Sequence, residues 1–261
     1  MKRNDPVRAK RRARRARRKL VQLELRLGRP KRRRRRRRAR ARVPHRTRPV
    51  VDRNHPIHVT LRMRSDVPSL RTRRATRTIV GVFRAARGRF GLRVTQFAIL
   101  DDHVHLLVEA EGERGLTQGM RGLGTRLAIH VNRVFARGGR LFDDRYHARA
   151  LQTPLEVRRG LAYVLHNYRK HASERGRHID VRWLDPHSSA IAFDGWSVPG
   201  LAPRRSLAAC GLLPPRTWLL ALGWRLHGWT LDPSEGPGGT RAGPKPSARA
   251  APRAEPLRRA A

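Results

Sequence analysis

The sequence predicts an α+β fold with the order strand, helix, strand, strand, helix, strand, helix. Three observations predict it. Residues 59–63 alternate apolar and polar side chains, and residues 94–110 form an apolar run, as strands do. Residues 68–87 and 116–135 carry apolar side chains at helical spacing. A further helix follows Thr153. This order is that of a ferredoxin-like βαββαβ sheet with one additional C-terminal helix.

The first strand and the first helix are indicated by a change in the spacing of apolar residues, from every second residue to helical spacing. Val59, Leu61 and Met63 alternate with polar residues, which is typical of a half-buried strand. Pro68 then opens a basic helix that runs to about Arg87, and glycines at 88 and 91 end it.

Two histidines share one face of the third predicted strand. Residues 94–100 form the second strand, Asp101 and Asp102 supply a tight turn, and residues 103–110 form the third. Successive strand side chains point to opposite faces, so His103 and His105 project together. Two adjacent imidazoles can chelate a divalent metal, although such pairs also occur as ordinary polar residues.

The last predicted helix begins with strong capping signals. Residues 116–135 form a second helix that ends at two glycines, and residues 146–151 form the fourth strand. Thr153 then stands at the N-cap, Pro154 at the first helical position and Glu156 at the third.

Within this helix, one tyrosine stands apart from the apolar residues. The apolar stripe consists of Val157, Leu161, Val164, Leu165 and Tyr168. At about 100° per residue, Tyr163 lies opposite that stripe, beside Arg159 and Lys170, and Asn167 follows one turn later on the same side. Tyr163 is therefore either a surface tyrosine or part of a phosphate-handling site.

Taken in order, these motifs resemble a known family. The resemblance covers about residues 50–235 and rests on His58-Val59-Thr60-Leu61-Arg62, His103-Val104-His105, Asp144-Arg145-Tyr146-His147-Ala148-Arg149, Tyr163-Val164-Leu165-His166-Asn167, Pro215-Arg216-Thr217-Trp218-Leu219-Leu220 and Gly223-Trp224-Arg225. This set is similar to the REP-associated tyrosine transposases, of the HUH (IS200-like) single-strand DNA transposases. Many relatives read Tyr-Ile-His-x-Asn-Pro, whereas here Asn167 is followed by Tyr168. Either His166 or Asn167 could then be the third metal ligand, and Asn167 is favoured because it shares a face with Tyr163.

The resemblance implies a metal-dependent tyrosine transposase and endonuclease that cleaves and rejoins single-stranded DNA at hairpin, REP-like sequences through a 5′-phosphotyrosine. Tyr163 would be the nucleophile, and His103, His105 and Asn167 would hold Mg²⁺ or Mn²⁺. No nucleotide cofactor is expected, because the covalent link retains the ester energy. The protein would be a monomer or homodimer in the bacterial cytoplasm, associated with the nucleoid. We expect five basic residues to line the DNA path: Arg62, Arg145, Arg149, Arg159 and Lys170.

Composition independently indicates a polyanionic partner. The 261 residues include 61 Lys and Arg against 19 Asp and Glu, a formal net charge of +42. Nucleic acid is the default partner for such a charge, and no apolar run is long enough to span a bilayer. The single cysteine, Cys210, excludes an internal disulfide and a cysteine-based zinc cluster. A non-catalytic basic DNA- or RNA-binding protein, or an inactivated transposase relative, is the alternative.

Charge and composition also divide the chain. Residues 1–50 contain 25 Lys and Arg and 2 Asp and Glu, a charge of +23, and are predicted to be a disordered nucleic-acid-binding arm. Residues 54–177 form the predicted catalytic domain. Residues 178–232 form an accessory region whose tryptophans mostly pack, with base stacking as an alternative. Residues 233–261 are predicted to be a disordered tail.

Overall fold

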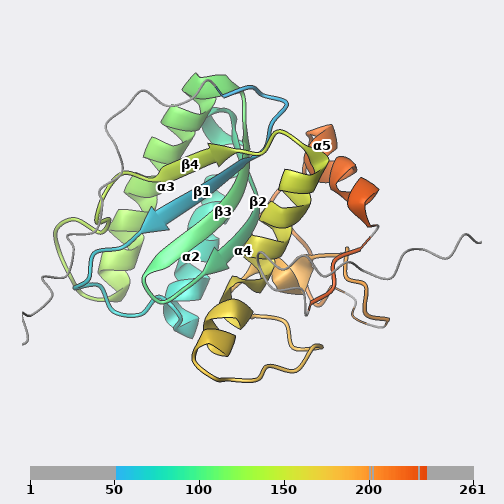
Figure 1. Cartoon of the computed structure of the whole chain (residues 1–261). Helices are drawn as coiled ribbons and strands as arrows, with labels where there is room; N and C mark the ends of the chain where they lie inside the picture. Colours follow the sequence, from blue (N-terminus) through green and yellow to red (C-terminus); the bar gives the residue numbers. More distant parts are fainter. Residues whose placement is uncertain (1–50, 200, 202, 229, 234–261) are drawn as a thin grey trace, which may run out of the picture. The chain divides into compact units, whose positions relative to one another are not determined.

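The computed structural model describes residues 51–233, apart from 200, 202 and 229 (Figure 1). All of these residues fall within one compact unit, Val43–Ala261. The predicted arm of residues 1–50 and the predicted tail, apart from Pro233, lie outside the described residues.

Four antiparallel strands form a sheet in the order β2-β3-β1-β4. They are β1 (Ile57–Arg62), β2 (Leu92–Ile99), β3 (His103–Ala110) and β4 (His147–Ala150). Strand β3 lies between β2 and β1, with Thr60 opposite His105 and Arg62 opposite His103. The predicted α+β, ferredoxin-like order is confirmed, and the strand that carries the two histidines is central, as expected.

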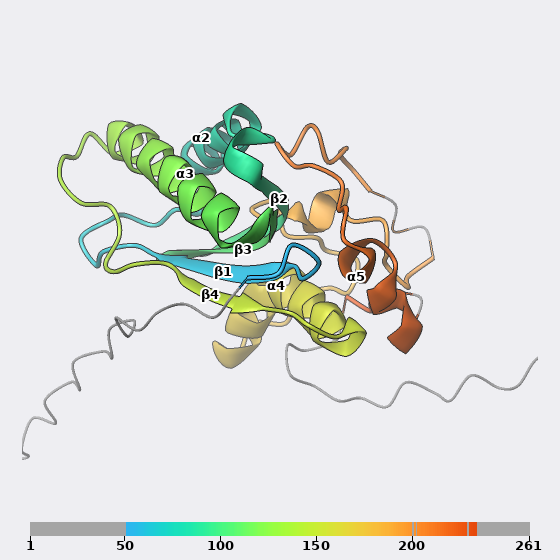
Figure 2. The same cartoon turned by 90° about the horizontal axis from the view of Figure 1, so that it is seen from above.

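Three long helices cover the two faces of the sheet (Figure 2). Helices α2 (Arg73–Ala85) and α3 (Gly112–Val134) lie on one face, and α4 (Pro154–Glu174) lies on the other. The remaining helical segments are short: η1 (Arg89–Gly91), η2 (Ser189–Ala192), α5 (Trp218–Ala221) and η3 (Gly223–His227).

Side-chain alternation gives the sheet one apolar and one polar face. In β1, Ile57, Val59 and Leu61 are buried, whereas His58 and Thr60 between them are partly exposed. The apolar set packs toward α2 and α3, since His58 and its neighbours face α4. Burying each such aliphatic side chain contributes about 1.5–3 kcal/mol. The apolar face therefore fixes the register that places the histidines beneath α4.

Helix α2 begins five residues later than the sequence indicated. Thr72 is the N-cap and its hydroxyl accepts a hydrogen bond from the Ala75 N–H at 3.1 Å. Residues 68–71 are instead bound to the β2–β3 turn, where the Leu70 N–H donates to the Asp101 carbonyl at 3.0 Å. Pro68 thus belongs to a connecting segment, because the hairpin turn supplies the hydrogen bonds that a first helical turn would have made.

The capping of α4 is confirmed. The Thr153 hydroxyl accepts from the Glu156 N–H at 3.2 Å, and the Glu156 carboxylate accepts from the Gln152 N–H at 2.8 Å. The helix runs on to Glu174 and contacts β2 and β3 on one side and α5 and η3 on another.

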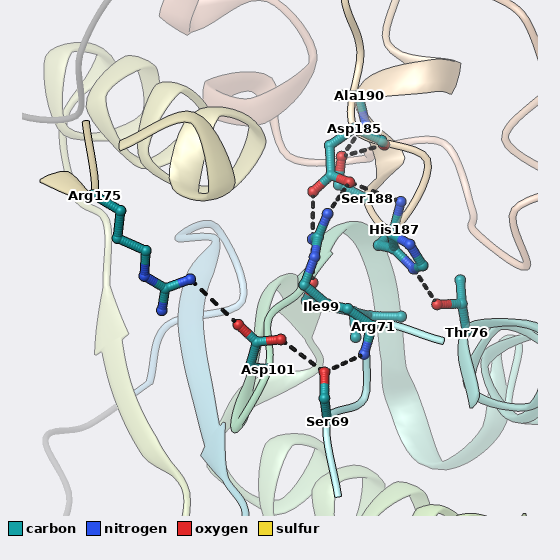
Figure 3. Close-up of polar contacts among 10 residues, drawn as sticks. All are labelled: Ser69, Arg71, Thr76, Ile99, Asp101, Arg175, Asp185, His187, Ser188 and Ala190. Atoms are coloured by element: carbon teal, nitrogen blue, oxygen red, sulfur yellow. Dashed lines mark hydrogen bonds and ion pairs between the residues drawn. The ribbon is translucent and has the colours of Figure 1, made fainter. Parts of the chain in front are cut away.

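Arg71 links the C-terminal region, residues 178–232, to the sheet (Figure 3). The Arg71 guanidinium donates twice to the Asp185 carboxylate, both at 2.9 Å, and once to the Ile99 carbonyl at 2.9 Å. It also lies 3.6 Å from the ring centroid of Tyr168 on α4. The adjoining backbone extends the sheet edge, since the Ile99 N–H donates to the His187 carbonyl at 2.9 Å.

In the described ranges, no helix is long and apolar enough to cross a membrane.

Candidate active site

The polar face of the sheet brings three histidines together beneath α4. The rings of His103 and His105 are 4.7 Å apart between centroids, and the His58 ring stacks on His105 at 5.1 Å. His105 Nδ1 lies 3.1 Å from His58 Nε2 and 3.1 Å from the Thr60 hydroxyl. His105 Nε2 is buried and has no hydrogen-bond partner among the described residues. That nitrogen is therefore left for a ligand that the protein itself does not supply.

Asp102 orients the other strand histidine. Its carboxylate lies 2.7 Å from His103 Nδ1 and also accepts from Arg62 at 2.8 Å. A carboxylate bound to one ring nitrogen fixes the tautomer and directs the other nitrogen outward, as it does for metal-binding histidines. Asp102 therefore orients His103 in addition to forming the turn, and its position in the turn did not predict this contact.

Burial favours the neutral form of both strand histidines. Burial lowers the pKa of His105 well below its ordinary value, and the neighbouring His103 and His58 lower it further. Burial also lowers the pKa of His103, although Asp102 opposes that shift. A neutral imidazole is the form that binds metals.

Tyr163 projects from α4 onto these histidines. Its ring centroid lies 5.1 Å from that of His105 and 5.4 Å from that of His58, and Lys170 Nζ is 6.0 Å from it. The Tyr163 side chain therefore faces the histidines of the sheet, while α4 also contacts α5 and η3 of the C-terminal region.

Both candidates for the third ligand are buried, Asn167 at 1% and His166 at 3% exposed, and they differ in what they pack against. Neither the amide oxygen nor the amide nitrogen of Asn167 has a hydrogen-bond partner among the described residues. The His166 ring packs on Trp196 of the C-terminal region, 5.3 Å between centroids. Asn167 is thus an orphaned buried amide one turn from Tyr163.

This donor set fits a divalent ion of mixed nitrogen and oxygen preference. It offers imidazole nitrogens whose neutral form burial favours and a buried amide oxygen that lacks a partner among the described residues. No group of three or more His, Cys, Asp or Glu side chains in the described part of the chain could hold a metal.

Two of the five predicted DNA contacts lie at this site. Arg62 is paired with Asp102, and the exposed Arg149 is paired with Glu156 at 2.8 Å. Lys170 lies near Tyr163, with Nζ also 4.0 Å from Glu174. Arg145 and Arg159 are exposed. Arg62 and Lys170 are thus brought to the histidine cluster.

Two further histidines belong to the cluster and were not among the predicted site residues. His58 is the more deeply placed, and burial lowers its pKa to about 4, with His147 and Arg149 adding to the shift. His171 follows Asn167 by one turn, and its ring lies 6.2 Å from that of His103. The alternation of β1 placed His58 and Thr60 on one face, but only the pairing of β1 with β3 shows that they meet His105.

Comparison with known proteins finds a similarity to one transposase family. Residues 52–167 match the family model described as "Transposase IS200 like". Residues 52–167, slightly less than half of the chain, are therefore similar to the IS200-like transposases.

Two transposases are among the solved structures that are similar to this chain. One is a REP-associated tyrosine transposase bound to a REP hairpin, 14% identical, covering 56% of this chain and 82% of that one, with a TM-score of 0.42. Another, from Deinococcus radiodurans R1, is described as a transposase and is 13% identical, covering 54% of this chain and 100% of that one, with a TM-score of 0.33. No curated protein matches the chain.

Proposed function

We propose that this protein is a metal-dependent tyrosine transposase that cleaves and rejoins single-stranded DNA at REP-like hairpins through a 5′-phosphotyrosine. The observation that carries the proposal is the approach of Tyr163, on α4, to within 5.1 Å of His105, on β3. A nucleophile and a candidate metal ligand from distant parts of the chain meet on a strongly basic protein. The hairpin substrate is supported by the ordered set of motifs.

The chemistry is a transesterification at phosphorus. The Tyr163 oxygen forms a bond to phosphorus while the bond from phosphorus to the 3′-oxygen breaks, which leaves a 3′-hydroxyl. The phenol proton passes to solvent, and the departing 3′-oxygen takes up a proton. When bound to His103, His105 and Asn167, Mg²⁺ or Mn²⁺ would polarise the scissile phosphate. Lys170 and Arg62 attract the phosphate to Tyr163.

Rejoining is the reverse reaction with another strand. A 3′-hydroxyl displaces Tyr163 from phosphorus, so the ester energy is conserved and no nucleotide cofactor is consumed. The proposed setting is the bacterial cytoplasm, where the nucleoid supplies the DNA, and the proposed assembly is a monomer or homodimer.

The test is a covalent adduct. The full chain is incubated with Mn²⁺ and a labelled hairpin with a single-stranded flank, and a denaturing gel resolves the protein–DNA species. Tyr163→Phe should abolish the adduct while leaving DNA affinity unchanged. Tyr168→Phe is the matched control, because that ring lies under Arg71 and phenylalanine keeps its packing. An adduct formed by Tyr163→Phe contradicts the assignment. Absence of any adduct with the unaltered protein supports the non-catalytic alternative.

A further inference from the structure

A second concave site lies away from the histidine cluster. It is a cleft of about 550 Å³ between α2 and residues 186–210, at the edge of the sheet formed by β2. Its rim carries Arg73, Arg77, Arg84 and Arg205, and its inner lining includes Val80 and Ile191. The volume falls in the range of about 300–1,000 Å³ that is usual for ligand sites.

The four arginines of the rim have no acidic partners among the residues that the structure describes. None of them forms an ion pair with any residue in the described ranges, and α2 contains no acidic residue. Arg84 donates one hydrogen bond to the Ala209 carbonyl at 2.9 Å, and this contact leaves its positive charge uncompensated by any acidic side chain of the described residues. Like charges gathered around a cleft repel one another, and an anion between them relieves that repulsion. The rim therefore favours a ligand with phosphate groups.

The interior of the cleft favours an aromatic ring. Val80, Ile191 and the buried Phe97 and Cys210 contribute apolar surface. The polar pair on the wall is already satisfied, since Thr76 Oγ1 and His187 Nδ1 are 2.5 Å apart (Figure 3). A free phosphate would use only the rim, whereas a nucleotide would use both the rim and the interior. In a duplex the bases stay stacked, so only a single strand can offer one.

We propose that this cleft binds one unstacked base of single-stranded DNA, with the adjoining phosphates on the arginine rim. The site is distinct from the histidine cluster, because α2 and α4 lie on opposite faces of the sheet (Figure 2). The proposal rests on the proposed function in taking single-stranded DNA as the ligand. The cleft on the α2 face of the sheet would hold the single strand that flanks the cleaved hairpin.

The first test fills the cleft without changing its charge. Ala209 lines the cleft and is exposed, so Ala209→Trp adds a bulky side chain there, whereas Ala208 is exposed outside the lining and gives the control Ala208→Trp. Fluorescence anisotropy with labelled oligothymidylate and with a duplex of equal length measures affinity. Ala209→Trp should weaken single-strand binding at least fivefold relative to Ala208→Trp and leave duplex binding unchanged. Equal single-strand affinity of the two variants overturns the proposal.

The second test reverses the charge of the rim. Arg77→Glu with Arg205→Glu is compared with Arg114→Glu with Arg121→Glu on α3, which changes the net charge equally. The cleft pair should weaken single-strand binding at least tenfold more than the α3 pair. If the cleft pair weakens duplex binding as much as single-strand binding, the rim is a general polyanion surface and the proposal fails.

A third test locates the bound base. Oligonucleotides containing 5-iododeoxyuridine should photo-cross-link to residues 73–84 or 186–210, and cross-links confined to other peptides contradict the proposal.

Failure of this proposal is separable from failure of the proposed function. At saturating hairpin, Ala209→Trp should still form the Tyr163 adduct, because the cleft contributes no reacting group. Loss of single-strand preference in Ala209→Trp, in a protein that forms no adduct, would uphold the cleft and overturn the transposase assignment.

Discussion

At the scale of single residues, the buried amide of Asn167 is the least satisfied group near Tyr163. A buried polar group without a partner costs about 1–3 kcal/mol of stability, and the proposed metal ligation would give the Asn167 amide a partner. Asn167→Leu should therefore raise the free energy of unfolding of the metal-free protein by about 1 kcal/mol and lower its affinity for Mn²⁺. Urea unfolding in chelator and calorimetric titration with Mn²⁺ measure the two effects.

His166 provides the control for that prediction, because it occupies the next position but packs on Trp196. His166→Gln should lower stability and leave Mn²⁺ affinity within twofold. The assignment of Asn167 as third ligand is wrong if His166→Gln weakens Mn²⁺ binding more than Asn167→Leu does.

His58 acts on the site through another residue. Its Nε2 shares the His105 Nδ1 with the Thr60 hydroxyl, which directs His105 Nε2 away from the sheet. His58→Phe keeps a ring on His105 but removes that nitrogen, and losing such an outer partner typically lowers metal affinity about 10–100-fold. Calorimetry with Mn²⁺ should show a loss toward the lower end, because Thr60 remains. His147→Phe, an exposed histidine on β4, is the control, and an equal loss there would show that His58 has no special part.

At the scale of secondary-structure elements, the clamp of Arg71 on Asp185 decides how the C-terminal region is held. Both side chains are nearly buried, at 10% and 4% exposed. Removing one partner of a buried pair leaves an uncompensated charge, so Asp185→Asn should cost about 3–5 kcal/mol of stability. Thermal and urea unfolding measure the loss.

The matched control is Asp194→Asn, since that carboxylate is 78% exposed and 3.9 Å from Arg225. It should change stability by less than about 0.5 kcal/mol. Replacing both partners with Arg71→Met and Asp185→Leu should recover part of the loss, because no lone charge remains buried. A double variant as unstable as Asp185→Asn would mean that packing of Arg71 on Tyr168 matters more than the charge pair.

Local signals predicted the elements, and tertiary contacts decided the exceptions. Thr153 and Glu156 predicted the start of α4 because capping depends only on adjacent residues. The predicted helix start at Pro68 was wrong because the following Leu70 N–H donates to the carbonyl of Asp101, about thirty residues further on. Periodicity predicted that His103 and His105 share one strand face and that Tyr163 lies off the apolar stripe of its helix, whereas the positions of His58 and His171 depend on strand pairing and on how α4 crosses the sheet. Such long-range placement has no local pattern to reveal it.

At the scale of the whole molecule, positive charge is present well beyond the site. The sequence outside residues 1–50 has 36 Lys and Arg against 17 Asp and Glu, a charge of +19. In the described part, basic residues surround the histidine cluster on the α4 face and the cleft on the α2 face. A strand that reaches both faces gains phosphate contacts with each, which raises affinity without reading sequence.

The largest share of the charge, +23 of +42, belongs to residues 1–50. These residues contain no pattern suited to catalysis or base readout, whereas the proposed recognition lies within residues 54–235. Each phosphate contact steepens the dependence of affinity on salt, by about 0.7 in the logarithmic slope for single strands. Deleting residues 1–50 should therefore weaken binding to every nucleic acid and flatten the salt slope, while the preference for a hairpin over a scrambled strand survives. Titrating both proteins with both DNAs at several salt concentrations measures this. Loss of the preference on truncation would assign recognition to the arm, and no preference in either protein would favour a non-specific binder over a transposase.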